Sequence, residues 1–313
     1  MKGRHGMTSL VSNKVKKNLQ IYGMLAPNLI LFILLSVYPM LWVFRFMFYQ
    51  YGGYGTGKPV FVGFENFVRL FRRDPVYWQS VLNTFIYAGA KILFVIPLSF
   101  FSAVMLTKKN LRGAGFFRAT LFLPTVMSSA VMALVFYLLF NVYSGEVNKY
   151  LMLTGLMKTP FNWLGQEHAM LTVIIIGVWG GLGNYMIYFI AGLQGIPEDI
   201  YESAELDGVN WIQRVWYITL PMLGPVLKMI LMLSIVIAFQ DMTTMMVLTE
   251  GGPCNATMVM FLYAYQFFFP ISQSATVATQ FGYGAAVSVV SAAIVGIVTI
   301  IYLRLSRKLD ELY

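Results

Sequence analysis

The sequence has little charge and few of the side chains that carry disulfide or metal chemistry. Only 11% of its 313 residues are charged, against roughly 25% in an ordinary soluble domain, and 58% are hydrophobic. Too few polar residues remain to cover the surface of a soluble protein, and the composition therefore indicates an integral membrane protein. The single cysteine, Cys254, excludes an intramolecular disulfide, and two distant histidines, His5 and His168, offer little for a metal site.

The sequence also lacks the motifs of membrane-embedded enzymes and of ATP hydrolysis. It contains no HExxH zinc motif, no GxSxG nucleophile turn and no pair of intramembrane carboxylates. It has no glycine-rich phosphate loop that ends in Gly-Lys-Ser or Gly-Lys-Thr. We therefore expect no catalytic residue, no cofactor and no bound metal, and any ATP that drives this protein must be bound by a separate chain.

The apolar residues gather in stretches that are long enough to cross a bilayer, which takes about 20 residues in a helix. The first stretch follows a basic tail, but it is longer than the apolar core of a signal peptide and no cleavage pattern follows it. We interpret it as a retained span. No alternating strand pattern occurs, so the sequence predicts an all-α integral membrane protein with six transmembrane helices, at residues 23–48, 80–106, 117–140, 169–193, 223–247 and 281–303.

The net charge of +9 does not indicate a nucleic-acid partner, because the basic residues lie at the ends of the apolar stretches. Lysine and arginine are more numerous on the side of the two termini, which predicts that both termini are cytoplasmic. An amphipathic helix at FENFVRLF, on the membrane surface, accounts for three of the arginines on the other side. The terminal side holds Lys2, Arg4, Lys14, Lys16, Lys17, Lys108, Lys109, Arg112, Arg118, Arg214, Arg304, Arg307 and Lys308; the other side holds Lys58, Arg69, Arg72, Arg73, Lys149 and Lys158.

One loop on the terminal side, residues 195–222, is unusually acidic for such an apolar chain. Pro197 suits the first turn of a helix, and Gly208 suits its end because glycine accepts the left-handed conformation. A second helix is predicted from about Asn210 to Thr219, so the loop is a compact helix-turn-helix. Tyr201, Ala204 and Gly208 share one side of the first helix, where a partner's surface has room to approach. The five acids within ten residues are Glu198, Asp199, Glu202, Glu205 and Asp207.

The same loop resembles the EAA loop of permease subunits of binding-protein-dependent ABC importers. Glu202-Ser203-Ala204, Gly208, Ile218 and Leu220-Pro221 fit the pattern EAA-x3-G-x9-I-x-LP without a gap. Serine and Val209 replace alanines that are common in that pattern. Further segments are similar to the carbohydrate branch, near the larger maltose permease subunit and the glycerol-3-phosphate permeases: FVGFENFVRLFRRDPVYWQSVLNTFIY (61–87), RGAGFFRATLFLP (112–124), AGLQGIP (191–197) and LTEGGP (248–253).

The resemblance implies a type I ABC importer permease fold with a cytoplasmic EAA coupling helix, in a bacterial cytoplasmic membrane. The domains would be a basic tail (1–21), a six-span permease domain (22–306) and a C-terminal tail (307–313). The implied partners are a cytosolic ABC ATPase dimer, a second related permease, an extracytoplasmic solute-binding protein that faces the 141–168 and 251–257 loops, a carbohydrate ligand and membrane lipid. The residues implied to couple to the ATPase are Glu202, Ser203, Ala204, Asp207, Gly208, Leu220 and Pro221.

The resemblance also places a substrate site in the fourth and fifth spans, with Gly181, Asn184, Ser234 and Asp241 as lining residues. Tyr185, Tyr188 and Phe239 are nearby aromatics that can stack on sugar rings. Asp241 has a second interpretation, a hydrogen bond between helices, and the two stand about equal. Lys91, deep in the second span, either pairs with Asp241 or faces a water-filled gap, and the sequence favours the structural pairing.

A stand-alone secondary transporter is the alternative to an importer subunit. Such a transporter needs proton or sodium relays and often has inverted repeats with a pair of broken helices. The sequence has one deep acid, Asp241, and shows no duplicated broken-helix pattern, so it favours the importer subunit. The identity of the carbohydrate does not follow from these landmarks.

Overall fold

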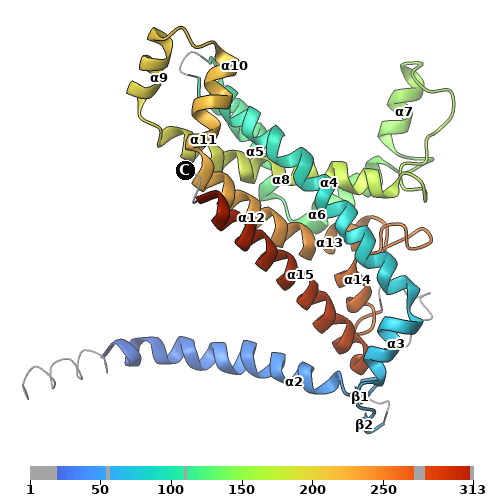
Figure 1. Cartoon of the computed structure of the whole chain (residues 1–313). Helices are drawn as coiled ribbons and strands as arrows, with labels where there is room; N and C mark the ends of the chain where they lie inside the picture. The colour runs from blue at the N-terminus through green and yellow to red at the C-terminus, as the bar shows by residue number, and fades with distance from the viewer. Residues whose placement is uncertain (1–19, 54–56, 109–110, 271–278, 311–313) are drawn as a thin grey trace, which may run out of the picture.

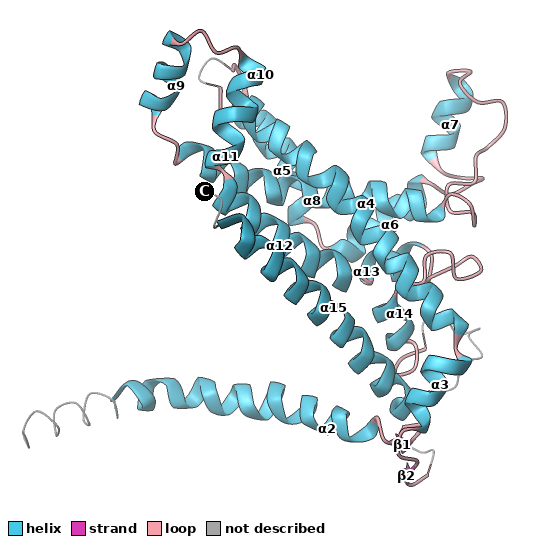
Figure 2. Cartoon of the chain, viewed as in Figure 1, coloured by secondary structure: helices cyan, strands magenta, loops and turns pink. Residues whose placement is uncertain are grey.

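The computed structural model describes residues 20–53, 57–108, 111–270 and 279–310, and helices dominate this part of the chain (Figure 2). The basic residues predicted in the tail before residue 20 lie outside the described residues. The elements are η1 Ile33–Val37, α2 Tyr38–Phe46, β1 Tyr49–Gln50, β2 Val60–Phe61, α3 Glu65–Arg73, α4 Pro75–Leu106, α5 Ala114–Val126, α6 Ser129–Leu139, α7 Glu146–Leu153, α8 Ala169–Gln194, α9 Glu198–Leu206, α10 Trp211–Arg214, η2 Val215–Thr219, α11 Leu220–Met222, α12 Gly224–Gln240, α13 Thr243–Leu248, α14 Met260–Tyr265 and α15 Phe281–Asp310.

Five of the predicted spans correspond to segments that are long and apolar enough to cross a membrane. They are Gln20–Phe46, Pro75–Leu106, Ala169–Gln194, Gly224–Leu248 and Phe281–Arg307. The sixth predicted span is present only if α5 and α6 are counted as one broken span. The six-span prediction therefore holds if this bent pair of helices crosses the membrane as one span.

The continuous helix predicted over residues 117–140 is wrong, because α5 and α6 meet at a bend of 98°. Met127 and Ser128 between them are extended, with ψ of 141° and 140°. Pro124 precedes the break, and proline removes a helical hydrogen bond. The Ser128 side chain then accepts a hydrogen bond from the Val131 amide at 3.3 Å and caps α6.

A short antiparallel pairing of β1 with β2 was not predicted by the sequence. It joins Tyr49 to Phe61 and Gln50 to Val60. Each strand has only two residues, which is too few to show the alternation of polar and apolar residues that predicts a strand. The pairing closes the connection between the first span and α3. The helix predicted at FENFVRLF is confirmed as α3, in which Leu70 is buried.

The long helix α4 is central to the bundle, where it packs along α8 and also contacts α12 and α14. α8 packs against α5, and α12 packs against α15. The acidic-loop helices α9 and α10 lie at one end of the bundle with the C-terminal end of α15, and α3 with the strands lies at the other end (Figure 1). The largest fully buried side chains include Tyr77, Tyr87, Phe189 and Met186.

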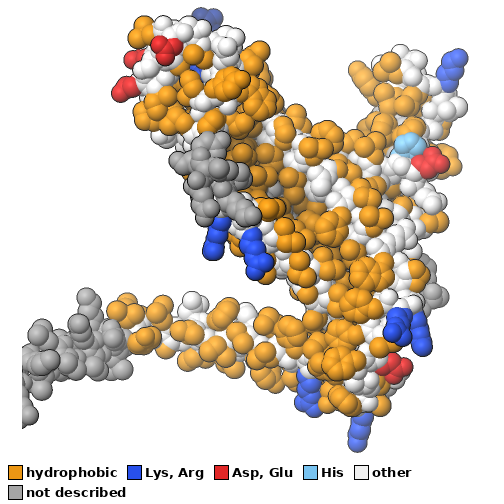
Figure 3. Space-filling view, viewed as in Figure 1, with side chains coloured by type: hydrophobic (Ala, Val, Ile, Leu, Met, Phe, Trp, Pro, Cys, Tyr) orange, Lys and Arg blue, Asp and Glu red, His pale blue; other side chains and the backbone are white. Residues whose placement is uncertain are grey.

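The N-terminal helix, Gln20–Phe46, stands apart from this bundle (Figure 1). No residue in its apolar stretch is buried within the chain, although α2, its C-terminal part, contacts α15. Hydrophobic side chains cover it in the space-filling view (Figure 3). A helix that is apolar on every side is stable only against lipid or a partner.

At the α3 end of the bundle, Asp74 joins three helices. Its side chain accepts hydrogen bonds from the Tyr77 amide at 3.0 Å, from the Tyr263 hydroxyl at 2.6 Å and from the Tyr283 hydroxyl. Further along α4, the Asn83 amide donates to the carbonyls of Asn255 and Met258 at 2.9 and 3.0 Å. These bonds fix the turn at residues 251–257 against α4.

Candidate transport site and coupling loop

A cavity of about 370 Å³ lies where the two broken spans have their breaks. Met127 and Ser129 line it from the break between α5 and α6, and Asp241 and Thr243 line it from the break between α12 and α13. The glycine-rich part of α8 and Lys91 of α4 complete the wall. The cavity is therefore formed by four segments that are far apart in the sequence.

The break in the fifth span leaves backbone groups without helical partners at membrane depth. Asp241 is extended, with a ψ of 108°, and α13 begins only at Thr243. The helix predicted over 223–247 is therefore interrupted. Irregular backbone at this depth is tolerated only where it is buried in protein or lines a water-filled cavity. Discontinuous helices of this kind surround substrate sites in many transporters.

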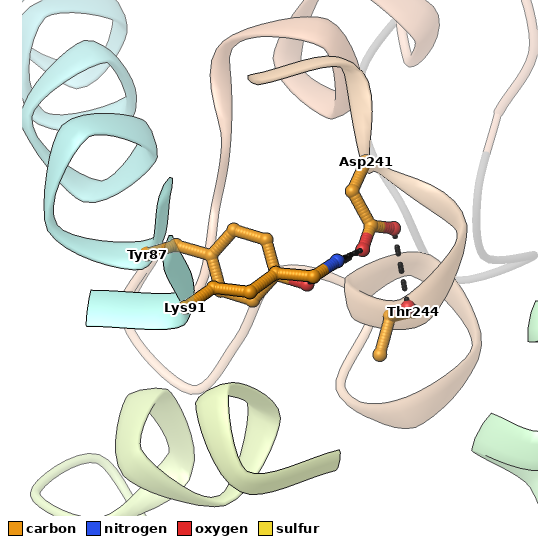
Figure 4. Close-up of polar contacts among 4 residues, drawn as sticks. All are labelled: Tyr87, Lys91, Asp241 and Thr244. Carbon is orange, nitrogen blue, oxygen red and sulfur yellow. Dashed lines mark hydrogen bonds and ion pairs between the residues drawn. The ribbon is translucent and has the colours of Figure 1, made fainter. Parts of the chain in front are cut away.

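Asp241 is held by three side chains at the edge of this cavity (Figure 4). The Lys91 ammonium and the Tyr87 hydroxyl donate to its Oδ2 at 3.0 and 2.5 Å, and the Thr244 hydroxyl donates to its Oδ1 at 3.1 Å. Lys91 also donates to the Tyr87 hydroxyl at 3.0 Å. The predicted pairing of Lys91 with Asp241 is confirmed.

Tyr87 and Thr244 were missed by the sequence analysis. A signal for Tyr87 was available, because Tyr87 and Lys91 are four residues apart and so share one face of α4. Thr244 follows Asp241 by three residues, across a break that hydropathy does not show. Both residues complete the hydrogen bonding of the carboxylate.

The structure brings three of the four predicted substrate residues together. Gly181, Asn184 and Asp241 line the cavity. Ser234 does not: it is buried in α12, and its hydroxyl donates to the Leu231 carbonyl at 2.8 Å. Of the three aromatics named above, Tyr185 lines the cavity, whereas Phe239 packs edge-on against Phe85 at 5.0 Å and Tyr188 is absent from the lining.

The acidic loop folds as the predicted helix-turn-helix. α9 begins after Pro197, and its end is formed by Gly208 in the left-handed conformation, with φ of +74°. The Val209 amide donates to the Ala204 carbonyl at 3.0 Å, which closes the helix end. Asn210 and Gln213 form a capping box at the start of the second helix. This second helix runs on through η2 and α11 to Met222, so it extends past the predicted end at Thr219.

The side of α9 that carries Tyr201 and Ala204 packs against the second helix of the loop, so its predicted exposure to a partner is wrong. Ala204 is buried, and the Tyr201 hydroxyl lies 3.2 Å from the Thr219 hydroxyl. The contact fixes the two helices of the loop against each other. Among the predicted coupling residues, Leu220 is half-buried, and the exposed ones are Glu202, Ser203, Asp207, Gly208 and Pro221.

Residues 95–311 match the family described as the binding-protein-dependent transport system inner membrane component. The chain belongs to this family of multi-pass transport permeases. The match includes the acidic loop at residues 195–222 and every residue that lines the cavity except Lys91.

Among individual proteins, the chain is 32% identical to the lactose transport system permease protein LacF of Rhizobium radiobacter, over 96% of this chain and 99% of LacF. It is 30% identical to the arabinooligosaccharides transport system permease protein AraP of Bacillus subtilis (strain 168), over 91% of this chain and 88% of AraP. A solved bacterial ABC transporter involved in the import of the acidic polysaccharide alginate superposes with a TM-score of 0.80. That match covers 95% of this chain and 98% of the other at 21% identity, and it shows the shared fold.

Proposed function

We propose that this chain is the transmembrane subunit of an ABC importer that translocates a carbohydrate. The observation that carries the proposal is the cavity at the breaks of two spans, in a chain that also presents a compact coupling loop. The carbohydrate class is supported by similar proteins whose names specify lactose, arabinooligosaccharides and trehalose/maltose. A site that reads hydroxyl groups needs hydrogen-bonding side chains. The Asn184 amide is suitable, and the Asp241 carboxylate accepts three hydrogen bonds within the chain and keeps acceptor capacity for one hydroxyl.

In this proposal the coupling loop binds a cytosolic ATPase dimer, which binds the ATP. Glu202 and Asp207 are exposed on α9 and can form charge-assisted contacts with that partner. Leu206, 90% exposed, and Tyr217, 78% exposed, give the same loop apolar surface to bury. ATP-driven movement of the ATPase reaches the spans through the contacts between α9 and the second helix, which include the hydroxyls of Tyr201 and Thr219 and the ion pair of Glu205 with Arg214.

A second permease subunit fits the exposed N-terminal helix. No residue in the apolar stretch of Gln20–Phe46 is buried in this chain, and a partner permease can cover this helix. One coupling loop serves one ATPase subunit, so an ATPase dimer requires a second permease. Lipid covers the remaining apolar surface.

The orientation in the bacterial cytoplasmic membrane follows from the coupling loop. The loop and the C-terminal end of α15 lie at the cytoplasmic side, and the N-terminal tail is assigned there too by its basic residues. The turn at residues 251–257 and the loop around α7 then face a solute-binding protein on the outside. A solved alginate transporter has been captured with a periplasmic protein that carries an alginate pentasaccharide.

The proposal is tested by uptake of a saccharide panel in cells that lack this chain. Loss of uptake of one saccharide, restored by the wild-type chain and prevented by depleting cellular ATP, supports it. Uptake that continues without ATP but collapses with the proton gradient supports a secondary transporter instead. Unchanged uptake of every saccharide contradicts the proposal.

A further inference from the structure

The cavity contains a positive and a negative charge that neutralise each other. Lys91 and Asp241 are the charged side chains among the described residues that line it. Their ammonium and carboxylate groups lie 3.0 Å apart, and the two side chains are 9% and 15% exposed. At this separation in a low-dielectric region the two charges act on a ligand as one neutral pair.

The hydrogen bonds of this pair are directed within the protein. Lys91 donates to Asp241 and to Tyr87, and Asp241 accepts from Lys91, Tyr87 and Thr244. An anionic ligand would need Lys91 to leave its carboxylate, and that would leave a charge unpaired inside the membrane. Such a charge is costly.

Four uncharged polar side chains in the same cavity have no such partners within the described part of the chain. The amides of Asn184 and Gln240 and the hydroxyls of Ser129 and Thr243 line it. These four side chains make no hydrogen bond to the described part of the chain. They offer donors and acceptors without charge, which is what the hydroxyl groups of a neutral sugar need.

We propose that Lys91 and Asp241 form a specificity-determining pair that keeps this cavity neutral and restricts it to uncharged saccharide units. Saccharides with a carboxylate or a phosphate are rejected because no unpaired cation compensates their desolvation. The inference rests on the proposed function. The fold itself does not set the charge of the cargo, since a protein of the same fold takes part in the import of acidic alginate.

The test measures saccharide binding to the chain, purified in lipid nanodiscs with the membrane partners that co-purify with it, by ligand-observed NMR. The panel contains neutral disaccharides, with maltose, lactose and galactobiose among them, and digalacturonate as the acidic counterpart of galactobiose. The variants are Asp241→Asn, which leaves Lys91 unpaired, and the double variant Lys91→Met with Asp241→Asn, which restores neutrality. Arg304→Gln, on the exposed cytoplasmic end of α15, is the matched charge control.

The wild-type chain and the control are expected to bind a neutral member and to reject digalacturonate. Asp241→Asn is expected to shift the preference toward digalacturonate by about tenfold or more. The double variant is expected to keep the neutral preference, and it keeps the test decisive if the single variant fails to insert. Three results would overturn this inference and leave the proposed function standing. They are a wild-type chain that prefers digalacturonate, an Asp241→Asn variant whose preference does not shift, and a double variant that binds neutral and acidic disaccharides equally. Binding of no saccharide by any form would overturn the proposed function with it.

Discussion

The hydroxyl of Tyr87 lies so close to Gly177 that a Cβ added to the glycine would be 2.5 Å from that oxygen. The same hydroxyl donates to Asp241 at 2.5 Å. Gly177 is on α8, Tyr87 is on α4, and Asp241 is at the break of the fifth span. Because Gly177 has no side chain, the Tyr87 hydroxyl can lie against α8, and from there it holds the Asp241 carboxylate at the edge of the cavity.

Gly177→Ala is expected to displace Tyr87 and to weaken its bond to Asp241. Overpacking of this kind costs about 1–3 kcal/mol, so uptake of the saccharide identified in the deletion strain should fall by roughly 5- to 150-fold. Gly89→Ala on α4 is the matched control, because nothing lies within 4 Å of the added atom. Equal uptake by the two variants, at equal amounts in the membrane, would show that the Tyr87 contact does not position the site.

Gly208→Val is expected to disrupt the coupling loop without unfolding the bundle. Gly208 has a φ of +74°, which a β-branched residue adopts only with strain, and it ends α9 where the ATPase is proposed to bind. Co-purification of the ATPase should be lost while the chain stays in the membrane. Gly155→Val provides the control, since Gly155 has a φ of +73° and also has nothing within 4 Å. Equal loss in both variants would point to strain in general rather than to the coupling loop.

Asp74→Asn is expected to lower the midpoint of thermal unfolding in detergent. Burial and the hydrogen bond to Asp74 raise the pKa of the Tyr263 hydroxyl, so this group stays a protonated donor. Replacing the carboxylate leaves buried hydroxyls of Tyr263 and Tyr283 poorly satisfied, at a cost of about 2–4 kcal/mol. Glu146→Gln removes the exposed pair with Lys149 and should cost under about 1 kcal/mol. A midpoint that moves equally in both would contradict the proposed role of Asp74.

Cys254 gives a direct test of the orientation. It is the single cysteine of the chain and is exposed in the turn at residues 251–257. A membrane-impermeant maleimide should label it in intact cells or in spheroplasts, and Cys254→Ser should abolish the labelling. In the Cys254→Ser background, Arg307→Cys should be labelled only in inverted vesicles. The reverse pattern would mean that the chain is inserted the other way.

The positions of the spans could be predicted from the sequence because a bilayer imposes a minimum apolar length. The breaks could not, since Met127, Ser128 and Asp241 interrupt helices within stretches whose hydropathy stays high. Tertiary packing decides these breaks: α6 folds back against α13, so the two irregular segments face one cavity.

The site was predicted in part, for similar reasons. Asn184 and Asp241 follow from the resemblance, and the pairing of Lys91 with Asp241 follows from the cost of a buried charge. Ser234 was misplaced because the resemblance does not give the depth of the cavity along α12: Ser234 lies two helical turns before Asp241, and its hydroxyl donates to the Leu231 carbonyl instead. The packed side of α9 was misjudged because small residues suit a contact inside the loop as well as a contact with a partner.

Affinity purification of the chain from its native membrane in mild detergent, followed by mass spectrometry, decides whether it is one subunit of an importer. The wild-type chain should bring down an ABC ATPase and a second multi-span permease, and a Glu202→Lys variant should lose the ATPase while it keeps the permease. Glu167→Lys, an exposed charge reversal in the loop before α8, should keep both. A chain that purifies alone or only with copies of itself, with no effect of Glu202→Lys, would contradict the importer and favour the secondary transporter.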